Sequence, residues 1–351
     1  MDSWIYVWIW ISCRDFRMTK IDTTPETIKA IYAHYESKPQ WRRPHLGASE
    51  IGSACDRKLW YNFRWCLQPK FEGRMLRLFE TGNREEERIV QNLRDIGIEV
   101  HDLNPKTGKQ IHYIDPDCAH FSGSLDGMGK GFIEAPKAWH VLEFKTASKK
   151  QWEALDVAGV LKHKPEHFAQ MQIYMHWSKV DRAYYISVCK DDDRMYGERI
   201  HYDKEIALKL IDRAHRIIHA DEAPNRCKGA KNPKEKGWSP CVYCDFKSIC
   251  YGKKCPEVNC RTCGQCDFND NGDVVCRGYN AAGDLKLSTK KQQEACKNHL
   301  FIPSLVPLEC CGVDAEKREV TYLFKDGSTF ANGKGEDQSS EILMEMINNE
   351  T

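Results

Sequence analysis

The spacing of apolar positions changes several times along this chain of 351 residues. Up to residue 96, and again over 164–177 and 204–220, apolar residues recur every three to four positions, as on one face of a helix. Over 109–147 and 182–202, short apolar stretches are separated by turn residues such as Asp, Pro and Gly, which is typical of strands and turns. The pattern predicts helices over 24–36, 49–62, 72–96, 164–177 and 204–220. It predicts strands over 109–114, 121–128, 139–147, 182–190 and 194–202, the last two as a hairpin.

Helices followed by a mixed set of strands and then further helices indicate an α/β core. Beyond it, residues 226–254 form a basic linker with eight Lys and Arg, and ten of the 17 cysteines lie between Cys227 and Cys296. Residues 313–351 carry nine acidic and four basic residues, as in a small acidic appendage or a partly disordered tail. We therefore expect four parts, over residues 1–17, 18–254, 255–310 and 311–351.

The net charge of the chain is +1, from 52 Lys and Arg against 51 Asp and Glu, which excludes a polycation that coats nucleic acid. No apolar run approaches the roughly 18 residues that span a bilayer. The longest, over residues 4–11, lacks a preceding basic residue and a cleavage site, so it is a poor signal peptide. We expect a cytoplasmic protein without a membrane segment. Because Met18 opens a more typical start, residues 1–17 are interpreted as an upstream extension or an interaction arm.

Acidic and basic side chains are placed to meet on two adjacent predicted strands. Asp126 ends one strand, and Glu143 and Lys145 lie two residues apart on the next, so their side chains share a face. Hard cations such as Mg²⁺ bind carboxylate oxygens, and such a cation activates water for attack on a phosphodiester. A nearby lysine orients that water or offsets charge in the transition state. The alternative is a surface ion pair on an amphipathic strand.

Two helices add candidate residues to this set. The long helix over 72–96 carries Glu85, Glu86 and Glu87, one of which is a candidate third carboxylate, although a solvated acidic face has the same pattern. Gln170 and Tyr174 stand four residues apart on a later helix and therefore share a face. An ordinary amphipathic helix also accounts for that pair.

In this order the residues resemble the PD-(D/E)xK nuclease superfamily, in its RecB-like exonuclease branch. The matching elements are the G-x3-E of Gly82–Glu86, Asp126 in GSLDG, Glu143 and Lys145 in EFK, and Gln170 and Tyr174 in QMQIY. Two positions depart from the family pattern. Leu125 replaces the proline that names the motif, and Glu86 stands where many relatives carry a histidine. The resemblance covers about residues 45–252.

The resemblance implies a restriction-endonuclease-like fold, with a mixed central sheet flanked by helices. It also implies a site in which Mg²⁺ or Mn²⁺ is held by Glu86, Asp126 and Glu143. Lys145 would then assist the attacking water. Gln170 and Tyr174 would support the site and the nucleic acid.

A first cysteine set surrounds the expected core. Cys241, Cys244 and Cys250 supply three closely spaced ligands, and Cys55 is the best candidate for a fourth, although alone it reads as a buried helix cysteine. The arrangement resembles the iron–sulfur staple of CRISPR-associated adaptation nucleases and AddAB-type recombination nucleases, in which a 4Fe–4S cluster ties the two ends of the domain together. The N-terminal helix of that family is matched by Ser49, Cys55, Arg57, Trp60 and Tyr61. Four thiolates equally suit Zn²⁺, and only the resemblance favours iron and sulfur.

A second cysteine set follows, with the C-x2-C and C-x2-H ligand pairs that are typical of a zinc ribbon. We expect its Zn²⁺ ligands to be Cys260, Cys263, Cys276 and Cys296, with His299 or Cys266 as substitutes. Since no carboxylate accompanies these ligands, a structural role is favoured over a second catalytic site. A docking surface for DNA or a protein is the alternative. Such tails resemble those attached to nuclease domains in phage genomes.

These features predict a metal-dependent DNA exonuclease of phage or bacterial recombination or DNA processing, acting on DNA ends or single strands. A recombination annealing protein or a helicase is the expected protein partner. Basic residues near the site would follow the DNA backbone, namely Lys130, Lys137, Lys149, Lys150, Lys162 and Lys164. Most of the large aromatic residues that could stack on bases are expected in the core instead, namely Trp60, Tyr61, Trp65, Trp152 and Trp177.

Three other functions compete with this prediction. An endonuclease or nickase would use the same core. A non-catalytic DNA-binding assembly protein would hold its metals only for structure, but the complete Glu, Asp and Glu-x-Lys set argues against a decayed site. A cysteine-based redox enzyme would need a CxxC beside a βαβ unit, which this sequence lacks.

Overall fold

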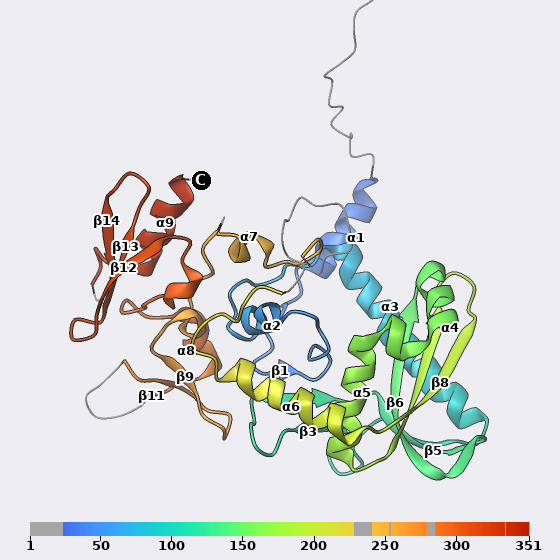
Figure 1. Ribbon diagram of the computed structural model, residues 1–351. Coiled ribbons are helices and arrows are strands. Elements are labelled where there is room, and N and C mark those ends of the chain that lie inside the picture. Colours follow the sequence, from blue (N-terminus) through green and yellow to red (C-terminus); the bar gives the residue numbers. More distant parts are fainter. Residues whose placement is uncertain (1–23, 228–240, 253, 279–284, 334, 351) are drawn as a thin grey trace, which may run out of the picture.

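The structure is a computed structural model that describes residues 24–227, 241–252, 254–278, 285–333 and 335–350 (Figure 1). The segment over 1–17 and residues 228–240 and 253 of the basic linker lie outside the described residues. Among the described helices, none is both long and apolar enough to span a membrane.

A five-stranded mixed sheet forms the centre of the core. Its strands run in the order β2, β5, β6, β7, β8, and only the β6–β7 pair is parallel. The parallel pair requires a crossover, which α4 and α5 supply. The bounds are β2 Glu99–His101, β5 Gly127–Phe132, β6 Ala135–Ala147, α4 Lys149–His163, α5 Pro165–Ser178, β7 Arg182–Cys189 and β8 Met195–His201. The expected mixed α/β sheet flanked by helices is thus confirmed.

The two faces of this sheet are covered by different helices. On one face, Leu142 and Phe144 of β6 pack with Ile89 and Leu93 of α3 (Gly73–Asp95). On the other, Val141 belongs to the main core with residues of α5. Because side chains alternate along a strand, Glu143 and Lys145 belong to the α5 side. The apolar alternation of β6 therefore decides where its charged residues point.

A smaller sheet and four helices complete the core. β4 lies between β1, to which it is parallel, and β3, to which it is antiparallel. The bounds are α1 Glu26–Glu36, β1 Leu46–Gly47, α2 Asp56–Phe63, β3 His112–Ile114, β4 Phe121–Ser124, α6 Lys204–Ile218 and α7 Lys247–Cys250. The large aromatic residues named above as candidates for base stacking are all buried, so the expectation that most of them belong to the core is confirmed.

Several elements differ from the sequence-based expectation. The strand expected over 121–128 is two strands of different sheets, β4 and β5, and Asp126 lies in the connection between them. Strand β2 was not predicted. The helix expected over 49–62 begins only at Asp56, because Cys55 caps it, its Sγ accepting from the N–H of Lys58 at 3.4 Å. The preceding turn packs so closely on α5 that a Cβ at Gly52 would lie 2.5 Å from the Cα of Glu166. Helix α4 was not predicted, since Gly159, with φ +75°, interrupts its pattern.

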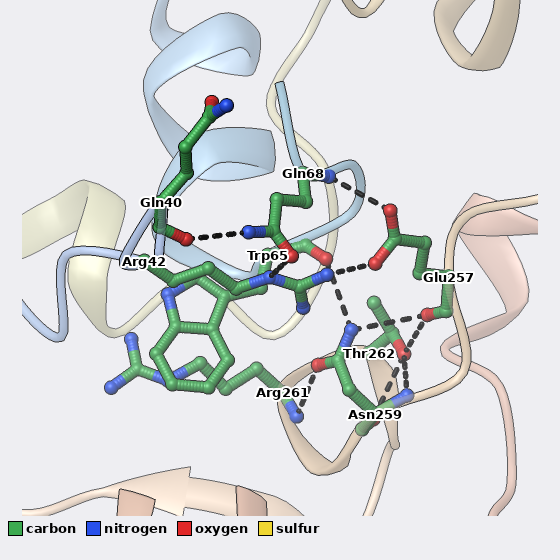
Figure 2. A network of polar contacts seen from close by, with 8 residues as sticks. All are labelled: Gln40, Arg42, Trp65, Gln68, Glu257, Asn259, Arg261 and Thr262. Atoms are coloured by element: carbon green, nitrogen blue, oxygen red, sulfur yellow. Dashed lines mark hydrogen bonds and ion pairs between the residues drawn. The ribbon is translucent and has the colours of Figure 1, made fainter. Parts of the chain in front are cut away.

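The cysteine-rich segment packs against the core through polar contacts (Figure 2) and apolar contacts. Glu257 accepts a hydrogen bond from the backbone N–H of Gln68 at 2.9 Å and contacts Arg42. Asn259 donates from Nδ2 to the carbonyl of Trp65 at 3.0 Å. Here the segment contains β9 Cys266–Phe268, β10 Val274–Cys276, β11 Leu285–Lys286, α8 Thr289–Glu294 and the 3-10 turns Cys260–Thr262 and Pro303–Leu305.

The acidic C-terminal part is a sheet and a helix that are fixed to the cysteine-rich segment. The antiparallel strands β12 Glu309–Asp314, β13 Glu319–Leu323 and β14 Thr329–Asn332 are followed by α9 Ser340–Glu350. The Ser340 hydroxyl lies 2.7 Å from Nδ1 of His299 and accepts a hydrogen bond from Asn332 at 2.9 Å. Residues 309–350 therefore form ordered structure where described, in place of a disordered tail.

Candidate active site and metal centres

The candidate active site begins where β5 and β6 meet. Asp126 directly precedes β5, and its Oδ2 accepts a hydrogen bond from the backbone N–H of Phe144 at 2.7 Å. This bond fixes the Asp126 carboxylate beside β6. Its side chain is 11% exposed, so it faces partly toward solvent.

Lys145 links the two carboxylates of these strands. Its Nζ lies 2.5 Å from Oε1 of Glu143 and 3.7 Å from Oδ2 of Asp126, and it donates to the carbonyl of Phe144 at 2.8 Å. Burial lowers the pKa of Lys145, but the carboxylates of Glu143 and Asp126 outweigh it, so the pKa is raised overall. Lys145 is therefore a permanent cation at this site.

Glu143 is completely buried and is held from behind by α5. Its Oε2 accepts a hydrogen bond from Nε2 of Gln170 at 2.9 Å. Burial raises the pKa of Glu143 to about 8; Lys145 opposes this shift, and the negative charges of Asp126 and Glu86 add to it. The carboxyl is thus partly protonated near neutral pH unless further positive charge arrives.

Of the three consecutive glutamates on α3, Glu86 is the one that joins the site. Glu85 and Glu86 both line a cavity of about 130 Å³ with Gly82 and Lys145, but only Glu86 interacts electrostatically with Asp126 and Lys145. Burial and then the charge of Asp126 raise the pKa of Glu86 to about 7. Glu85 instead pairs with Arg88 at 3.0 Å and Glu87 is exposed. The G-x3-E spacing places Gly82 one helical turn before Glu86, on the same face.

Gln170 and Tyr174 lie behind the carboxylates. Both are buried, and Tyr174 fills the space beside Gly123, where a Cβ would meet its hydroxyl oxygen at 2.6 Å. Burial raises the pKa of Tyr174, and its hydrogen bond with Gln170 opposes that shift. Since neither side chain is open to solvent, the geometry supports positioning of Glu143 rather than direct contact with nucleic acid.

His167 and Tyr185 also belong to this neighbourhood, and sequence reasoning missed both. Tyr185 of β7 stands opposite Glu143 in the strand register, and its hydroxyl lies 2.9 Å from Nδ1 of His167. Burial, with the charge of Lys145, lowers the pKa of His167 to about 3, so it is neutral. His167 lies one helical turn before Gln170, so its place beside the site could have been predicted from the sequence. The place of Tyr185 could not, because it depends on the β6–β7 register.

The first cysteine set converges as expected. Cys55, Cys241, Cys244 and Cys250 line one cavity of about 160 Å³ between α2 and the segment around α7. A fifth thiol, Cys227, was not predicted; its Sγ lies 3.9 Å from that of Cys241. Cys227 lies 14 residues before Cys241, apart from the three closely spaced cysteines, so its spacing did not indicate that it joins them.

Arg57 lies beside this cysteine cavity, as a residue that supports it. Its Nε donates to the Tyr61 hydroxyl at 2.7 Å, and another guanidinium N–H donates to the carbonyl of Pro224 at 3.0 Å. Its positive charge opposes the rise in the pKa of the Cys250 thiol that burial causes. These contacts favour a role for Arg57 in supporting the cysteine set over contact with a DNA phosphate.

The second cysteine set also lines a single cavity, of about 650 Å³, to which Cys260, Cys263, Cys266, Cys276 and Cys296 contribute. Cys266 and Cys276 are direct partners in the β9–β10 register. His299 is less suited as a substitute ligand, because both ring nitrogens have partners. Nδ1 lies 2.7 Å from the Ser340 hydroxyl, and Nε2 lies 3.0 Å from the carbonyl of Asn259. Of the two substitute ligands, Cys266 is therefore the better suited.

Two buried guanidinium groups lie next to Cys266. Arg261 is 1% exposed, and it donates to the carbonyls of Phe63 at 2.9 Å and Pro44 at 2.7 Å. Arg64 is 3% exposed and donates to carbonyl oxygens as well. Neither forms an ion pair with a carboxylate of the described chain. Burial lowers the pKa of Arg261 to about 9, and the Cys266 thiolate opposes that shift.

In neither cysteine set do three sulfur atoms of the described residues lie within 4.8 Å of one another. Zinc at about 2.3 Å from each sulfur holds thiolates roughly 3.8 Å apart. A single zinc ion would therefore draw these thiols inward, whereas a cluster of several atoms suits a wider spacing.

Comparison with known proteins gives limited similarity. No protein-family model and no curated protein matches the chain. Among solved structures, it is similar to the crystal structure of SSO0001, with 16% identity over 64% of this chain and 95% of that chain and a TM-score of 0.38. It is also similar to the alkaline exonuclease LHK-Exo from Laribacter hongkongensis, with 17% identity over 54% of this chain and 90% of that chain and a TM-score of 0.33. The same exonuclease in complex with dAMP gives 16% identity over the same shares and a TM-score of 0.36. With TM-scores below 0.5, the function has to be inferred from the site itself.

Proposed function

We propose that this protein is a metal-dependent deoxyribonuclease of the PD-(D/E)xK type that degrades DNA from its ends. The observation that carries the proposal is the convergence of Glu86, Asp126, Glu143 and Lys145 from α3, β5 and β6. Three acidic groups share one cation there, in a partly enclosed site. A phage or bacterial recombination or DNA-processing role, with an annealing protein or helicase as partner, remains a prediction.

The donor set suits Mg²⁺ or Mn²⁺. Both are hard cations that take carboxylate oxygens and retain water, and Glu86, Asp126 and Glu143 would hold one of them. Glu86 and Glu143 suit this assignment, because burial and then neighbouring negative charge raise both pKa values, and a bound cation would oppose both effects. When bound, the metal supplies a polarised phosphodiester and a water of lowered pKa.

The protein's own groups prepare the reaction. Lys145 stands between Glu143 and Asp126, where its ammonium can orient a water molecule and offset the negative charge that develops on phosphate oxygens. Gln170 fixes one oxygen of Glu143. A reacting group held in one orientation lowers the entropic cost of reaching the transition state.

The cysteine sets are proposed as structural centres. A 4Fe–4S cluster on Cys55, Cys241, Cys244 and Cys250 would join α2 to the segment around α7, and the cavity that these four cysteines share supports one centre held by all of them. For the second set we propose Zn²⁺ on four of its cysteines. The buried, carboxylate-free cations Arg64 and Arg261 support a negatively charged thiolate centre beside them, since a buried charge needs compensation.

A digestion assay tests the proposed function. The full-length protein, purified without oxygen, is incubated with Mg²⁺ or Mn²⁺ and with end-labelled linear duplexes, single strands or closed circles. Loss of linear DNA with circles spared is the expected result and identifies the preferred end. Cut circles would instead establish an endonuclease or nickase. Binding without cleavage of any substrate would contradict an enzymatic role.

A further inference from the structure

A third group of metal-ligating side chains lies outside the active site and outside both cysteine sets. It consists of Cys118 from the loop between β3 and β4, His219 from the end of α6, and Asp270 from the turn between β9 and β10. Among the described residues, this is the one set of three or more Cys, His, Asp or Glu whose ligand atoms all lie within 4.8 Å of one another. The sequence gives no hint of it, because the three residues are far apart in the chain.

The distances within the group match those between ligands of one small ion. Sγ of Cys118 lies 3.8 Å from Nε2 of His219, and this same nitrogen lies 3.0 Å from Oδ1 of Asp270. Zinc binds sulfur at about 2.3 Å and nitrogen or oxygen at about 2.0–2.2 Å, which places tetrahedral ligands roughly 3.3–3.8 Å apart. Only small movements of the side chains would therefore admit the ion.

The backbone around these ligands is fixed by contacts that do not depend on a metal. The N–H of Ala119 donates to the carbonyl of Asp270 at 2.8 Å, and the N–H of Cys118 donates to Oδ1 of Asp115 at 3.0 Å. Gly272, with φ +89°, brings the β9–β10 turn so close that a Cβ there would lie 3.1 Å from Cβ of Ala119. The loop and the turn thus present Cys118 and Asp270 to each other.

Burial and charge divide the group into an inner and an outer side. Cys118 is fully buried, whereas the side chains of His219 and Asp270 are 38% and 73% exposed. The outer side opens into a hollow that His219 and Asp270 share with Asp221 and with the ion pair of Asp267 and Arg277. A metal at this place would have three protein ligands and a fourth position facing solvent, in an acidic setting that attracts cations.

We propose that Cys118, His219 and Asp270 bind one Zn²⁺ ion, with water as the fourth ligand. Sulfur, imidazole and carboxylate ligands together suit zinc better than Mg²⁺ or Ca²⁺, which take oxygen ligands. The ion links the small sheet of the core, the end of α6 and the cysteine-rich segment. Its role is to fasten that segment to the core, independently of whether the protein cleaves DNA.

Zinc titration of the full-length protein, in competition with a chromophoric chelator, tests this site. The wild type is compared with Asp270→Asn, Cys118→Ser and the control Asp221→Asn. Asp270 is largely exposed, so its replacement preserves the fold even if Cys118→Ser does not. In Asp270→Asn we expect one zinc ion to bind with an affinity at least about 10-fold lower than in the wild type. Removal of residues that only support metal ligands already has an effect of this size. Asp221→Asn should bind all its zinc like the wild type.

Two results would overturn the proposal. Equal zinc number and affinity in the wild type and Asp270→Asn would show that Asp270 is no ligand and that its contact with His219 is an ion pair alone. An equal loss of zinc affinity in Asp221→Asn and Asp270→Asn would show that the ion is attracted by a diffuse acidic surface and is not held by specific ligands. Because zinc binding is measured directly, neither result depends on nuclease activity.

Discussion

Lys145 and Glu143 of strand β6 form an ion pair in which Nζ lies 2.5 Å from Oε1, and Glu143 is completely buried. A buried carboxylate is costly unless it is paired. Lys145 therefore has two functions at once. Its charge opposes the rise in the pKa of Glu143 that burial causes, and it places a cation 3.7 Å from Asp126, in the proposed metal site.

Replacement of Gln170, which supports Glu143 from α5, should lower metal affinity more than it lowers the stability of the fold. Gln170→Ala removes the donor to Oε2 of Glu143, and loss of such supporting hydrogen bonds typically costs 10–100-fold in metal affinity. We expect the Mg²⁺ concentration for half-maximal cleavage to rise by about that factor, with activity restored at high Mg²⁺.

The control for this experiment lies on the same helix. Gln172 is also buried and hydrogen-bonded, to the backbone of His201 and Asp203, but does not contact a carboxylate. Gln172→Ala should therefore lower thermal stability and leave the Mg²⁺ requirement unchanged. An unchanged Mg²⁺ requirement in Gln170→Ala would remove Gln170 from the site.

Metal affinity should increase with pH. Burial raises the pKa of Glu86 to about 7 and that of Glu143 to about 8, so both carboxyls carry protons at pH 6 when no metal is bound. A divalent cation has to displace these protons, so Mg²⁺ affinity should rise by about 10-fold or more per pH unit between pH 6 and 7 and level off above pH 8.

Calorimetric titration of Mg²⁺ at several pH values measures this dependence. Glu87→Gln, on the exposed side of α3, should retain the profile of the wild type. Glu86→Gln should give a shallower profile, because one fewer proton is displaced. A Mg²⁺ affinity independent of pH would contradict the electrostatic description of the site.

Loss of one ligand of the first cysteine set should remove its cluster. Cys244→Ala should lose the brown colour of an iron–sulfur centre and most of the soluble protein, whereas Cys310→Ser, at an exposed position of β12, should retain both. Cys227→Ser should keep the colour, since four other thiols line the cavity. Absorption spectra and elemental analysis under anaerobic conditions provide the readout. A colourless wild type that contains zinc instead would refute the iron–sulfur assignment.

The attachment of the cysteine-rich segment should depend on Arg261. Arg261→Met leaves the carbonyls of Pro44 and Phe63 without their donor and removes the stacking of the guanidinium on Trp65, at 4.1 Å from its ring centre. We expect the free energy of unfolding to fall by about 3 kcal/mol or more. Denaturant unfolding measures it, with the exposed Arg277→Met as the control. Equal midpoints for both variants would show that Arg261 does not fasten the segment.

The parts of the site that depend on local periodicity could be predicted from the sequence. Strand alternation places Glu143 and Lys145 on one face, and helical spacing joins Gln170 to Tyr174. The choice of Glu86 among three glutamates required the structure, because only the packing of α3 on β6 decides which side chain reaches Lys145.

Other features depend on contacts between distant segments, which spacing in the sequence does not reveal. Tyr185 enters the site through the β6–β7 register. Cys227 joins the first cysteine set across the linker, and Cys118 meets Asp270 only because the β9–β10 turn packs on the β3–β4 loop. The sequence indicated a zinc-ribbon-like module over 255–310, but it did not indicate that Arg261 of this segment is buried against the core. Composition does not distinguish a segment that stands apart from one that is packed in.

The central claim is that the carboxylates and Lys145 at β5, β6 and α3 form a metal-dependent phosphodiesterase site. It is tested most directly by the rate at which labelled nucleotide is released from linear DNA in Mg²⁺, for the wild type, Lys145→Ala and the control Lys209→Ala. We expect Lys145→Ala to lower the rate by at least about 100-fold, the loss typical for removal of one group that stabilises transition-state charge. It should still fold, because Glu143 can take up a proton, and Lys209→Ala, exposed on α6 and outside the basic residues expected to follow the DNA, should match the wild type. Equal rates for the wild type and Lys145→Ala would contradict the claim.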